Sequence, residues 1–294
     1  MTTGNTDWHY GRMLRHIGRR LTTREGLSRV LRDPGVAARF LRHWIWNANF
    51  REESAQDIAE RYRISLTALD QLARTYDEPL SEETIGAVFG NELETPDCRD
   101  MATLFDRNGS DKSNVHNCHL IYAALLKGRR HERLSILEIG LGTNNIGVRS
   151  NMGPEGRPGA SVRAFRDWAP KADVHGADVD QSILFHEERI TTHWVDQADP
   201  VSLTALAQTL APRKFDLIID DGLHEPHANL NTIHFALKLL APGGYLVVED
   251  IQGTRLEFWQ IAFTILRRAF SCHFLRTRAA YAFVIRAPEA ANTR

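Results

Sequence analysis

The sequence predicts an α/β protein built around a Rossmann-like, mostly parallel β-sheet. Three short apolar segments carry this prediction, at residues 135–139, 215–219 and 245–248, because each has the composition of a strand buried on both faces. Residues 229–240 show helical apolar spacing, and the turn at 242–244 follows them. Such a strand-helix-strand unit makes its two strands parallel, so their carboxyl ends should share one edge of the sheet.

The region before this sheet differs in composition. Residues 1–100 contain no lysine and show apolar residues at helical spacing, as at Leu27, Val30 and Leu31. We therefore expect an N-terminal helical domain over residues 1–100 and the sheet domain over residues 101–294. The helical domain should pack on the sheet or form a subunit interface, and we expect a homo-oligomer.

Composition narrows the class of protein further. With 294 residues, 43% of them hydrophobic, and a net charge of −1, the chain can form one α/β domain and a smaller appendage. The start lacks an apolar signal core and no run approaches about 20 apolar residues, so we expect a soluble, cytoplasmic protein without a membrane partner. Cys98, Cys118 and Cys272 have no metal-binding spacing, which indicates reduced packing thiols.

A glycine turn ends the first strand. Gly140 and Gly142 would let the backbone approach a ligand, because no Cβ stands in the way. A dinucleotide site would have a third glycine and open directly into a helix. Here Asn145 takes that place, and a polar, Gly- and Pro-rich segment at 144–158 precedes the helical pattern at 161–168. The pattern therefore disfavours a bound pyrophosphate.

Polar residues at three strand ends favour S-adenosylmethionine (SAM) instead. Glu138 precedes the turn, and this cofactor carries a sulfonium cation and an amino group but no phosphate. Asp178 ends the next strand, where an acid can accept both ribose hydroxyls. Asp196 and Gln197 then offer an acceptor and an amide to an adenine edge. Three such signals in the correct order predict a class I SAM methyltransferase sheet.

Two strands end in acidic pairs, Asp220–Asp221 and Glu249–Asp250. Converging carboxylates repel one another unless a cation or protons intervene, which argues for a hard, oxygen-binding metal such as Mg²⁺. We expect Asp221, Glu249 and Asp250 to be its ligands. With no thiolate nearby, zinc is disfavoured. One member of each pair could instead cap the following helix, and for Asp220 this alternative is as strong as a role at the cofactor.

His224 lies three residues after Asp221, on the turn that leads toward the helix. It should project from the sheet edge where the metal and the methyl donor meet. An imidazole is a suitable general base at neutral pH, so His224 is the candidate catalytic residue. His227 and His234 are better explained as solvated or helix-packing residues.

Several segments of the chain resemble the metal-dependent sugar O-methyltransferases of antibiotic biosynthesis. The resemblance covers roughly the C-terminal two thirds, and its segments are 109–112, 137–140, 159–165, 195–199, 219–224 and 248–250. It implies SAM at Glu138, Gly140, Asp178 and Asp196, Mg²⁺ at Asp221, Glu249 and Asp250, and His224 as the base. Ser161 and Asp220, in the same segments, are further candidates for cofactor binding, as are Gly142 and Gln197. Residues 270–275 and 280–285 predict the antiparallel hairpin with which such sheets end.

The expected function is Mg²⁺-dependent transfer of a methyl group from SAM to a hydroxyl, in particular a sugar hydroxyl of a glycosylated natural product. This chain departs from the family at Ala160, Leu223 and 252–255. The resemblance implies that these positions border the acceptor pocket or its supports. A catechol or another vicinal diol is therefore an alternative acceptor, since chelation needs only two adjacent oxygens. The segments 144–158 and that after Asp250 are candidate lids that would decide between them.

The main non-enzyme alternative is a DNA-binding regulator with a small-molecule sensor domain. Residues 55–69 resemble a helix-turn-helix. A recognition helix needs cations that face phosphate, yet residues 51–100 hold 5 arginines against 13 acids. Nucleic acid is therefore a disfavoured partner, although the first fifty residues are basic.

Overall fold

The structure, a computed structural model, describes residues 55–77 and 79–290. The chain divides into two compact units, Met1–Ser65 and Leu66–Arg294. The apolar spacing expected around residue 30 lies outside the described residues. Helix α4 (Ala55–Tyr76) is continuous, so the turn that a helix-turn-helix needs within residues 55–69 is missing, and that part of the regulator hypothesis is wrong.

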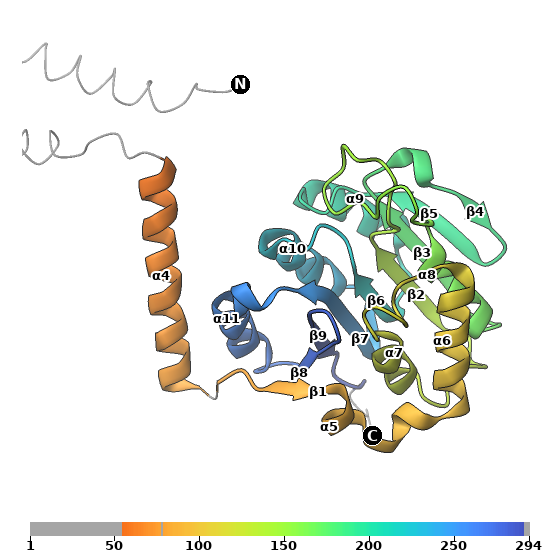
Figure 1. Cartoon of the computed structure of the whole chain (residues 1–294), viewed down its shortest axis with the longest axis horizontal. Coiled ribbons are helices and arrows are strands. Elements are labelled where there is room, and N and C mark those ends of the chain that lie inside the picture. Colours follow the sequence, from red (N-terminus) through yellow and green to blue (C-terminus); the bar gives the residue numbers. More distant parts are fainter. Residues whose placement is uncertain (1–54, 78, 291–294) are drawn as a thin grey trace, which may run out of the picture. The chain divides into compact units, whose positions relative to one another are not determined.

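The second unit contains a nine-stranded sheet with the order β1-β8-β9-β7-β6-β2-β3-β5-β4 (Figure 1). Its parallel centre consists of β7 (Leu240–Ile251), β6 (Phe215–Asp220), β2 (Ser135–Ile139), β3 (Asp173–Asp178) and β5 (Ile190–Trp194). The predicted hairpin is present as β8 (Ser271–Arg276) and β9 (Tyr281–Arg286), and β9 is antiparallel to both of its neighbours. A two-residue strand, β4 (His186–Glu187), adds an antiparallel edge. The expected Rossmann-like fold class is confirmed.

The sheet also takes in residues before position 100. Strand β1 (Glu82–Thr84) pairs with β8, and α5 (Ile85–Phe89), a 3₁₀ turn (Gly90–Glu94) and α6 (Pro96–Asn108) follow it. The domain boundary expected at residue 100 stays a prediction, as do the oligomeric state and the cytoplasmic location. In the described residues, no helix has the length and apolar character needed to cross a membrane.

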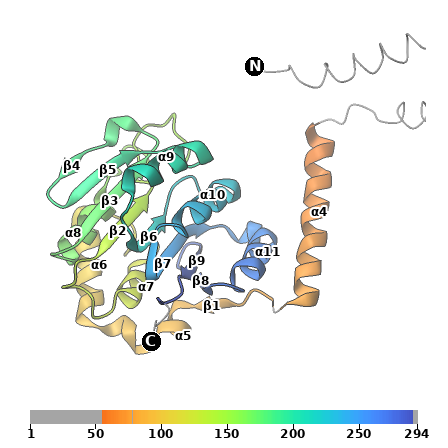
Figure 2. The same cartoon turned by 180° about the vertical axis from the view of Figure 1, so that it is seen from behind.

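Helices cover both faces of the sheet (Figures 1 and 2). Helices α6, α7 (His119–Leu125) and α8 (Ala160–Trp168) pack on one face, and α9 (Pro200–Leu210), α10 (Pro226–Ala236) and α11 (Leu256–Leu266) pack on the other. Neighbouring strand residues point to opposite faces of the sheet. Ile136 packs in the core on the side of α6, α7 and α8, and Leu137 packs in the core on the side of α9, α10 and α11. This two-sided burial explains why the central strands are continuous apolar runs.

The order of the strands determines where a ligand can bind. Strand β2 has β3 on one side and β6 on the other, so the chain reverses its direction of winding at β2. In open α/β sheets, ligands bind at such a switch point, beyond the carboxyl ends of the strands. Two boundaries differ from the prediction. Helix α10 spans Pro226–Ala236 rather than 229–240, and β7 begins at Leu240, where it pairs with Phe215, so it includes the turn predicted at 242–244.

Candidate active site

The glycine turn after β2 lies directly against the end of β6. Gly140 has φ 98°, its N–H donates to the Ala177 carbonyl (2.8 Å), and the Asp221 N–H donates to the Ile139 carbonyl (2.8 Å). A Cβ on Gly140 would lie 2.5 Å from the carbonyl carbon of Asp221. Only glycine fits this close approach, which brings the predicted cofactor turn beside the predicted metal ligands.

A cavity of about 320 Å³ lies at this edge of the sheet. It is formed by the ends of β2, β3, β5 and β6 together with residues 147–150 of the candidate lid. The predicted site residues among its lining are Gly140, Gly142, Asp178, Asp196, Gln197 and Asp221. The structure therefore brings together residues that are separated by more than eighty positions in the sequence.

The backbone fixes the acids of this cavity. Asp178 accepts hydrogen bonds from the Leu141 N–H (2.8 Å) and the Asp180 N–H (2.9 Å), and burial raises the pKa of its carboxyl. Asp196 accepts from the Ala198 N–H (2.9 Å). Carboxylate oxygens have further lone pairs, so both acids can still accept hydroxyl or amine donors from a ligand.

Asp220 supports the site from inside the protein. It is fully buried, and it accepts hydrogen bonds from the side-chain amides of Gln197 (2.5 Å) and Asn229 (3.0 Å). Gln197 in turn accepts from the Leu223 N–H (2.8 Å). The N-cap of α10 is Glu225, without a side-chain cap bond, so Asp220 fixes the loop before His224 rather than capping the helix.

Glu138 and Ser161 bind each other and are not part of the cavity lining. The Ser161 hydroxyl donates to Glu138 Oε2, while Glu138 Oε1 lies 3.4 Å from the Lys112 ammonium. Burial raises the pKa of Glu138 to about 7, against the opposing effect of Lys112. Their predicted contact with the cofactor stays a prediction.

A candidate cation site adjoins the cavity. Ligand atoms of Asp221, His224 and Asp250 all lie within 4.8 Å of one another, and His224 Nε2 is 3.9 Å from Asp221 Oδ1. Among residues 55–77 and 79–290, the buried His224 Nδ1 has no hydrogen-bond partner. The two carboxylates suit a hard divalent cation such as Mg²⁺, and the imidazole of His224 lies beside them.

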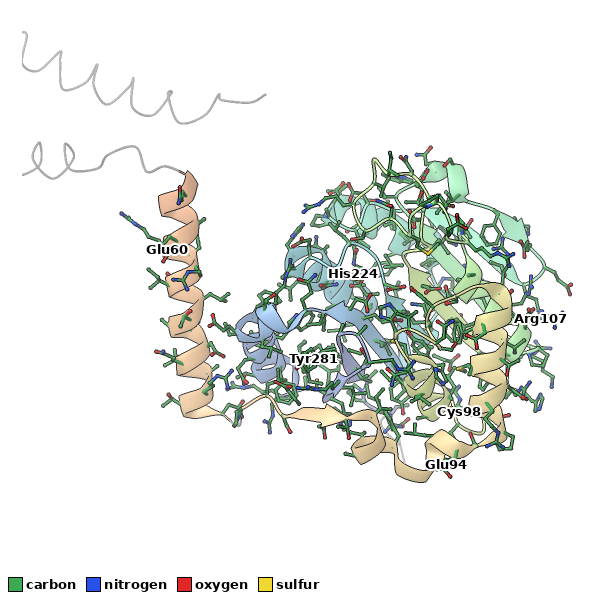
Figure 3. All side chains as sticks on the ribbon, viewed as in Figure 1. Glu60, Glu94, Cys98, Arg107, His224 and Tyr281 are labelled. Atoms are coloured by element: carbon green, nitrogen blue, oxygen red, sulfur yellow. The ribbon has the colours of Figure 1, made fainter. Side chains whose placement is uncertain are left out.

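The backbone at this site is strained. His224, in the loop between β6 and α10 (Figure 3), has φ 55°, and Asp250 has φ 52°. Residues other than glycine adopt this left-handed conformation rarely, at a cost of about 1–3 kcal/mol, and such outliers cluster at functional sites. Their coincidence at the candidate cation site supports a functional role for both residues.

Glu249 and Lys112 form a buried ion pair beside this group. The Lys112 ammonium is 2.9 Å from Glu249 Oε1 and 2.5 Å from Asp221 Oδ2. Burial would lower the pKa of Lys112, but the carboxylates outweigh it and the pKa is raised well above its ordinary value. The predicted role of Glu249 as a metal ligand stays a prediction, because in this structure its carboxylate contacts an ammonium.

His116 is a second positive partner of the acids. Its Nδ1 lies 2.9 Å from Asp250 Oδ1, and this contact raises the pKa of His116 to about 9. Burial would raise the pKa of Asp250, yet the contact with His116 lowers it. Sequence reasoning assigned no role to His116 or Lys112. The available signal was Lys112, the first lysine of the chain, at the end of the segment 109–112.

Both candidate lids contact the His224 loop. The Ser150 hydroxyl donates to the Leu223 carbonyl (3.0 Å), and the Arg255 guanidinium donates to the Glu225 carboxylate (2.6 Å). Met152 packs against Gly142 at the glycine turn. The segments at 144–158 and after Asp250 therefore meet at the loop that carries the candidate base.

The fold and the geometry of the site resemble those of SAM-dependent methyltransferases. Residues 137–251 match the methyltransferase domain family, and this segment runs from β2 to the end of β7. A methyltransferase of the mycinamycin biosynthetic pathway, solved in complex with Mg and SAH, has a similar fold, with a TM-score of 0.52 and 23% identity over 66% of this chain and 56% of that one.

Curated relatives narrow the resemblance to sugar O-methyltransferases of antibiotic pathways, as the sequence motifs indicated. The chain is 29% identical over 185 residues to the 8-demethyl-8-alpha-L-rhamnosyl tetracenomycin-C 2'-O-methyltransferase of Streptomyces olivaceus. The aligned residues make up 63% of this chain and 45% of that relative. It is 34% identical over 122 residues to the demethylmacrocin O-methyltransferase of Streptomyces fradiae, covering 42% and 28%. The chain thus matches less than half the length of these relatives.

Proposed function

We propose that this protein transfers a methyl group from SAM to a hydroxyl group in a reaction that depends on Mg²⁺. One observation carries the proposal: Asp221 lines the candidate cofactor cavity and also belongs to the candidate cation site. An acceptor oxygen held by the cation would thereby lie next to the methyl donor. Such proximity can supply about 7–11 kcal/mol toward a bimolecular reaction.

The cavity supports SAM as the donor. Asp178 and Asp196 are acceptors for ribose and adenine donors, and the backbone of Gly140 and Gly142 lines the same cavity. The bound cofactor would supply an electrophilic methyl group on a sulfonium. Gln197 is fixed by Asp220, so the adenine side of the cavity is rigid before a ligand binds.

The cation site supports activation of the acceptor. A divalent ion bound there would lower the proton affinity of a hydroxyl oxygen. Asp221 and Asp250 would hold the ion, and the strained loop would hold His224 where it can take the proton. His224 Nδ1 is buried and has no hydrogen-bond partner among the described residues, so no other protein group in that part of the chain fixes its protonation.

The acceptor we propose is a sugar hydroxyl of a glycosylated natural product. The support is the set of curated relatives, which are named as methyltransferases of glycosylated tetracenomycin and of demethylmacrocin. The methyltransferase of the mycinamycin pathway has also been solved in complex with Mg, SAH and mycinamycin VI. Transfer to a catechol is the outcome that would redirect the proposal.

The test is methyl transfer from labelled SAM to a panel of glycosides and catechols, with Mg²⁺ or with a chelator. We expect turnover of a glycoside that the chelator abolishes. The variant Asp221→Asn should lose about 10²–10³-fold in kcat, the range found when one electrostatic contact to a transition state is removed. Because Asn is nearly isosteric, binding of S-adenosylhomocysteine, measured by calorimetry, should change little.

The matched control is Glu188→Gln, which neutralises an exposed acid in the turn between β4 and β5. It should leave both turnover and cofactor binding as in the wild type. Full activity of the wild type in chelator, or of Asp221→Asn with Mg²⁺, would contradict the metal-dependent mechanism.

A further inference from the structure

Lys112 lies among the carboxylates of Glu138, Asp221 and Glu249, which we call the acid cluster. Its side chain is only 3% exposed, and its ammonium contacts the carboxylates of Asp221 (2.5 Å), Glu249 (2.9 Å) and Glu138 (3.4 Å). These acids come from the ends of three neighbouring strands, β2, β6 and β7, whereas Lys112 comes from the segment between α6 and α7. One lysine therefore connects three strands at the sheet edge.

The contacts match the chemistry of an ammonium group. Lysine has three N–H donors, and here it has three carboxylate neighbours. Lysine is almost never fully buried unless it is paired. Conversely, Glu138 and Glu249 are fully or nearly fully buried, and buried charges need partners. The lysine and the acids thus stabilise one another without any divalent ion.

We propose that Lys112 is a positioning residue that acts through Asp221 and Glu249. Its ammonium is the resident cation of the acid cluster: its single charge partly offsets the charges of these acids when no divalent ion is bound, and it opposes the binding of such an ion. The inference rests on the proposed function insofar as Asp221 is an ion ligand. It explains how the acids tolerate their proximity in the absence of a divalent ion, and it makes Lys112 a determinant of ion affinity.

The experiment compares Lys112→Met with the wild type. Methionine retains much of the side-chain volume but not the charge. In chelator, the thermal midpoint of Lys112→Met should fall, because two buried acids lose their cation. Added Mg²⁺ should then raise that midpoint more than it raises the wild-type midpoint. Calorimetry should give a Kd for Mg²⁺ about tenfold lower than in the wild type, equivalent to about 1.4 kcal/mol.

The direction of the affinity change separates this role from a purely structural one. If Lys112 only held the ligands in place, its removal would weaken Mg²⁺ binding. Weaker or unchanged Mg²⁺ binding by Lys112→Met would therefore overturn the proposal. Lys171→Met is the matched control, since Lys171 is exposed and lies just before β3, at the other end of the strands. It should change neither the midpoint nor the Kd.

A double variant keeps the inference testable if Lys112→Met does not fold in chelator. Lys112→Met/Glu249→Gln removes both the cation and one acid, so it should be more stable in chelator than Lys112→Met alone. Additive effects of the two substitutions would refute a direct pairing. This coupling is measured without metal or SAM, so it can hold even if the wild type binds no Mg²⁺, the outcome that would refute the proposed function instead.

Discussion

Replacing Gly140 by alanine should disrupt the cofactor cavity more than any strain at a single residue would explain. A Cβ at this position would lie 2.5 Å from the carbonyl carbon of Asp221 and 2.8 Å from the Cα of Gly222. These are backbone atoms, so no flexible side chain can move away. The ends of β2 and β6 must therefore separate to make room for the alanine side chain.

Two effects contribute to the expected loss of stability. The positive φ of Gly140 costs an L-amino acid about 1–2 kcal/mol. Overpacking against the β6 backbone adds about 1–3 kcal/mol. Gly128 offers a matched control, because it also has a positive φ, 73°, but has open space where its Cβ would be. Gly128→Ala should show only the first effect.

The assay is urea unfolding of both variants, combined with calorimetry of S-adenosylhomocysteine binding. Gly140→Ala should lose about 2–5 kcal/mol, the sum of the two effects, and bind the ligand at least tenfold more weakly. Gly128→Ala should lose about 1–2 kcal/mol and bind normally. If the two variants lost equal stability and both bound normally, the close approach of β2 and β6 would have no role in the site.

Two further predictions concern buried polar groups. Asn229→Ala removes a donor to the buried Asp220 and should lower the free energy of unfolding in urea by about 1–3 kcal/mol. The control Asn231→Ala, on the same helix, removes contacts to two backbone carbonyls and should cost less. Equal losses would refute the role of Asp220. Burial, with the neighbouring His175, lowers the pKa of His193 to about 4, so below pH 6.5 the unfolded chain gains a proton that the folded chain resists. The free energy of unfolding should therefore fall from pH 6.5 to pH 4, by less than about 1.4 kcal/mol per pH unit because His193 is only half-buried. His193→Gln should reduce this slope. An unchanged slope would contradict the role of His193.

The sequence was sufficient to predict the parallel sheet and the convergence of its acids. Both inferences depend on local signals: apolar runs of strand length, the glycines at 140 and 142, and acidic pairs at the ends of two such runs. Parallel pairing then brings separated strand ends to one edge, which β2, β6 and β7 confirm. Local pattern and topology together therefore locate most of the cavity.

The partners of the acids could not be predicted in the same way. Lys112 contacts Asp221 and Glu249, which are 109 and 137 positions away, and no periodic pattern connects them. The left-handed conformations of His224 and Asp250 are also invisible in the sequence, because neither is glycine. Sequence reasoning thus located the negative charges, whereas their countercharges follow only from the folded chain.

These countercharges change how the acid cluster should be understood. The sequence argument held that converging carboxylates need a metal, because like charges repel. In the structure, Asp221 and Glu249 contact the Lys112 ammonium and Asp250 contacts the His116 imidazole, so repulsion alone is a weaker argument for an ion. The stronger argument for an ion is local: Asp221, His224 and Asp250 converge at a strained loop beside the cofactor cavity. Strained backbone conformations cluster at functional sites. Compensation of the acids by Lys112 and His116 does not by itself account for the left-handed conformations of His224 and Asp250, whereas a role at an ion does.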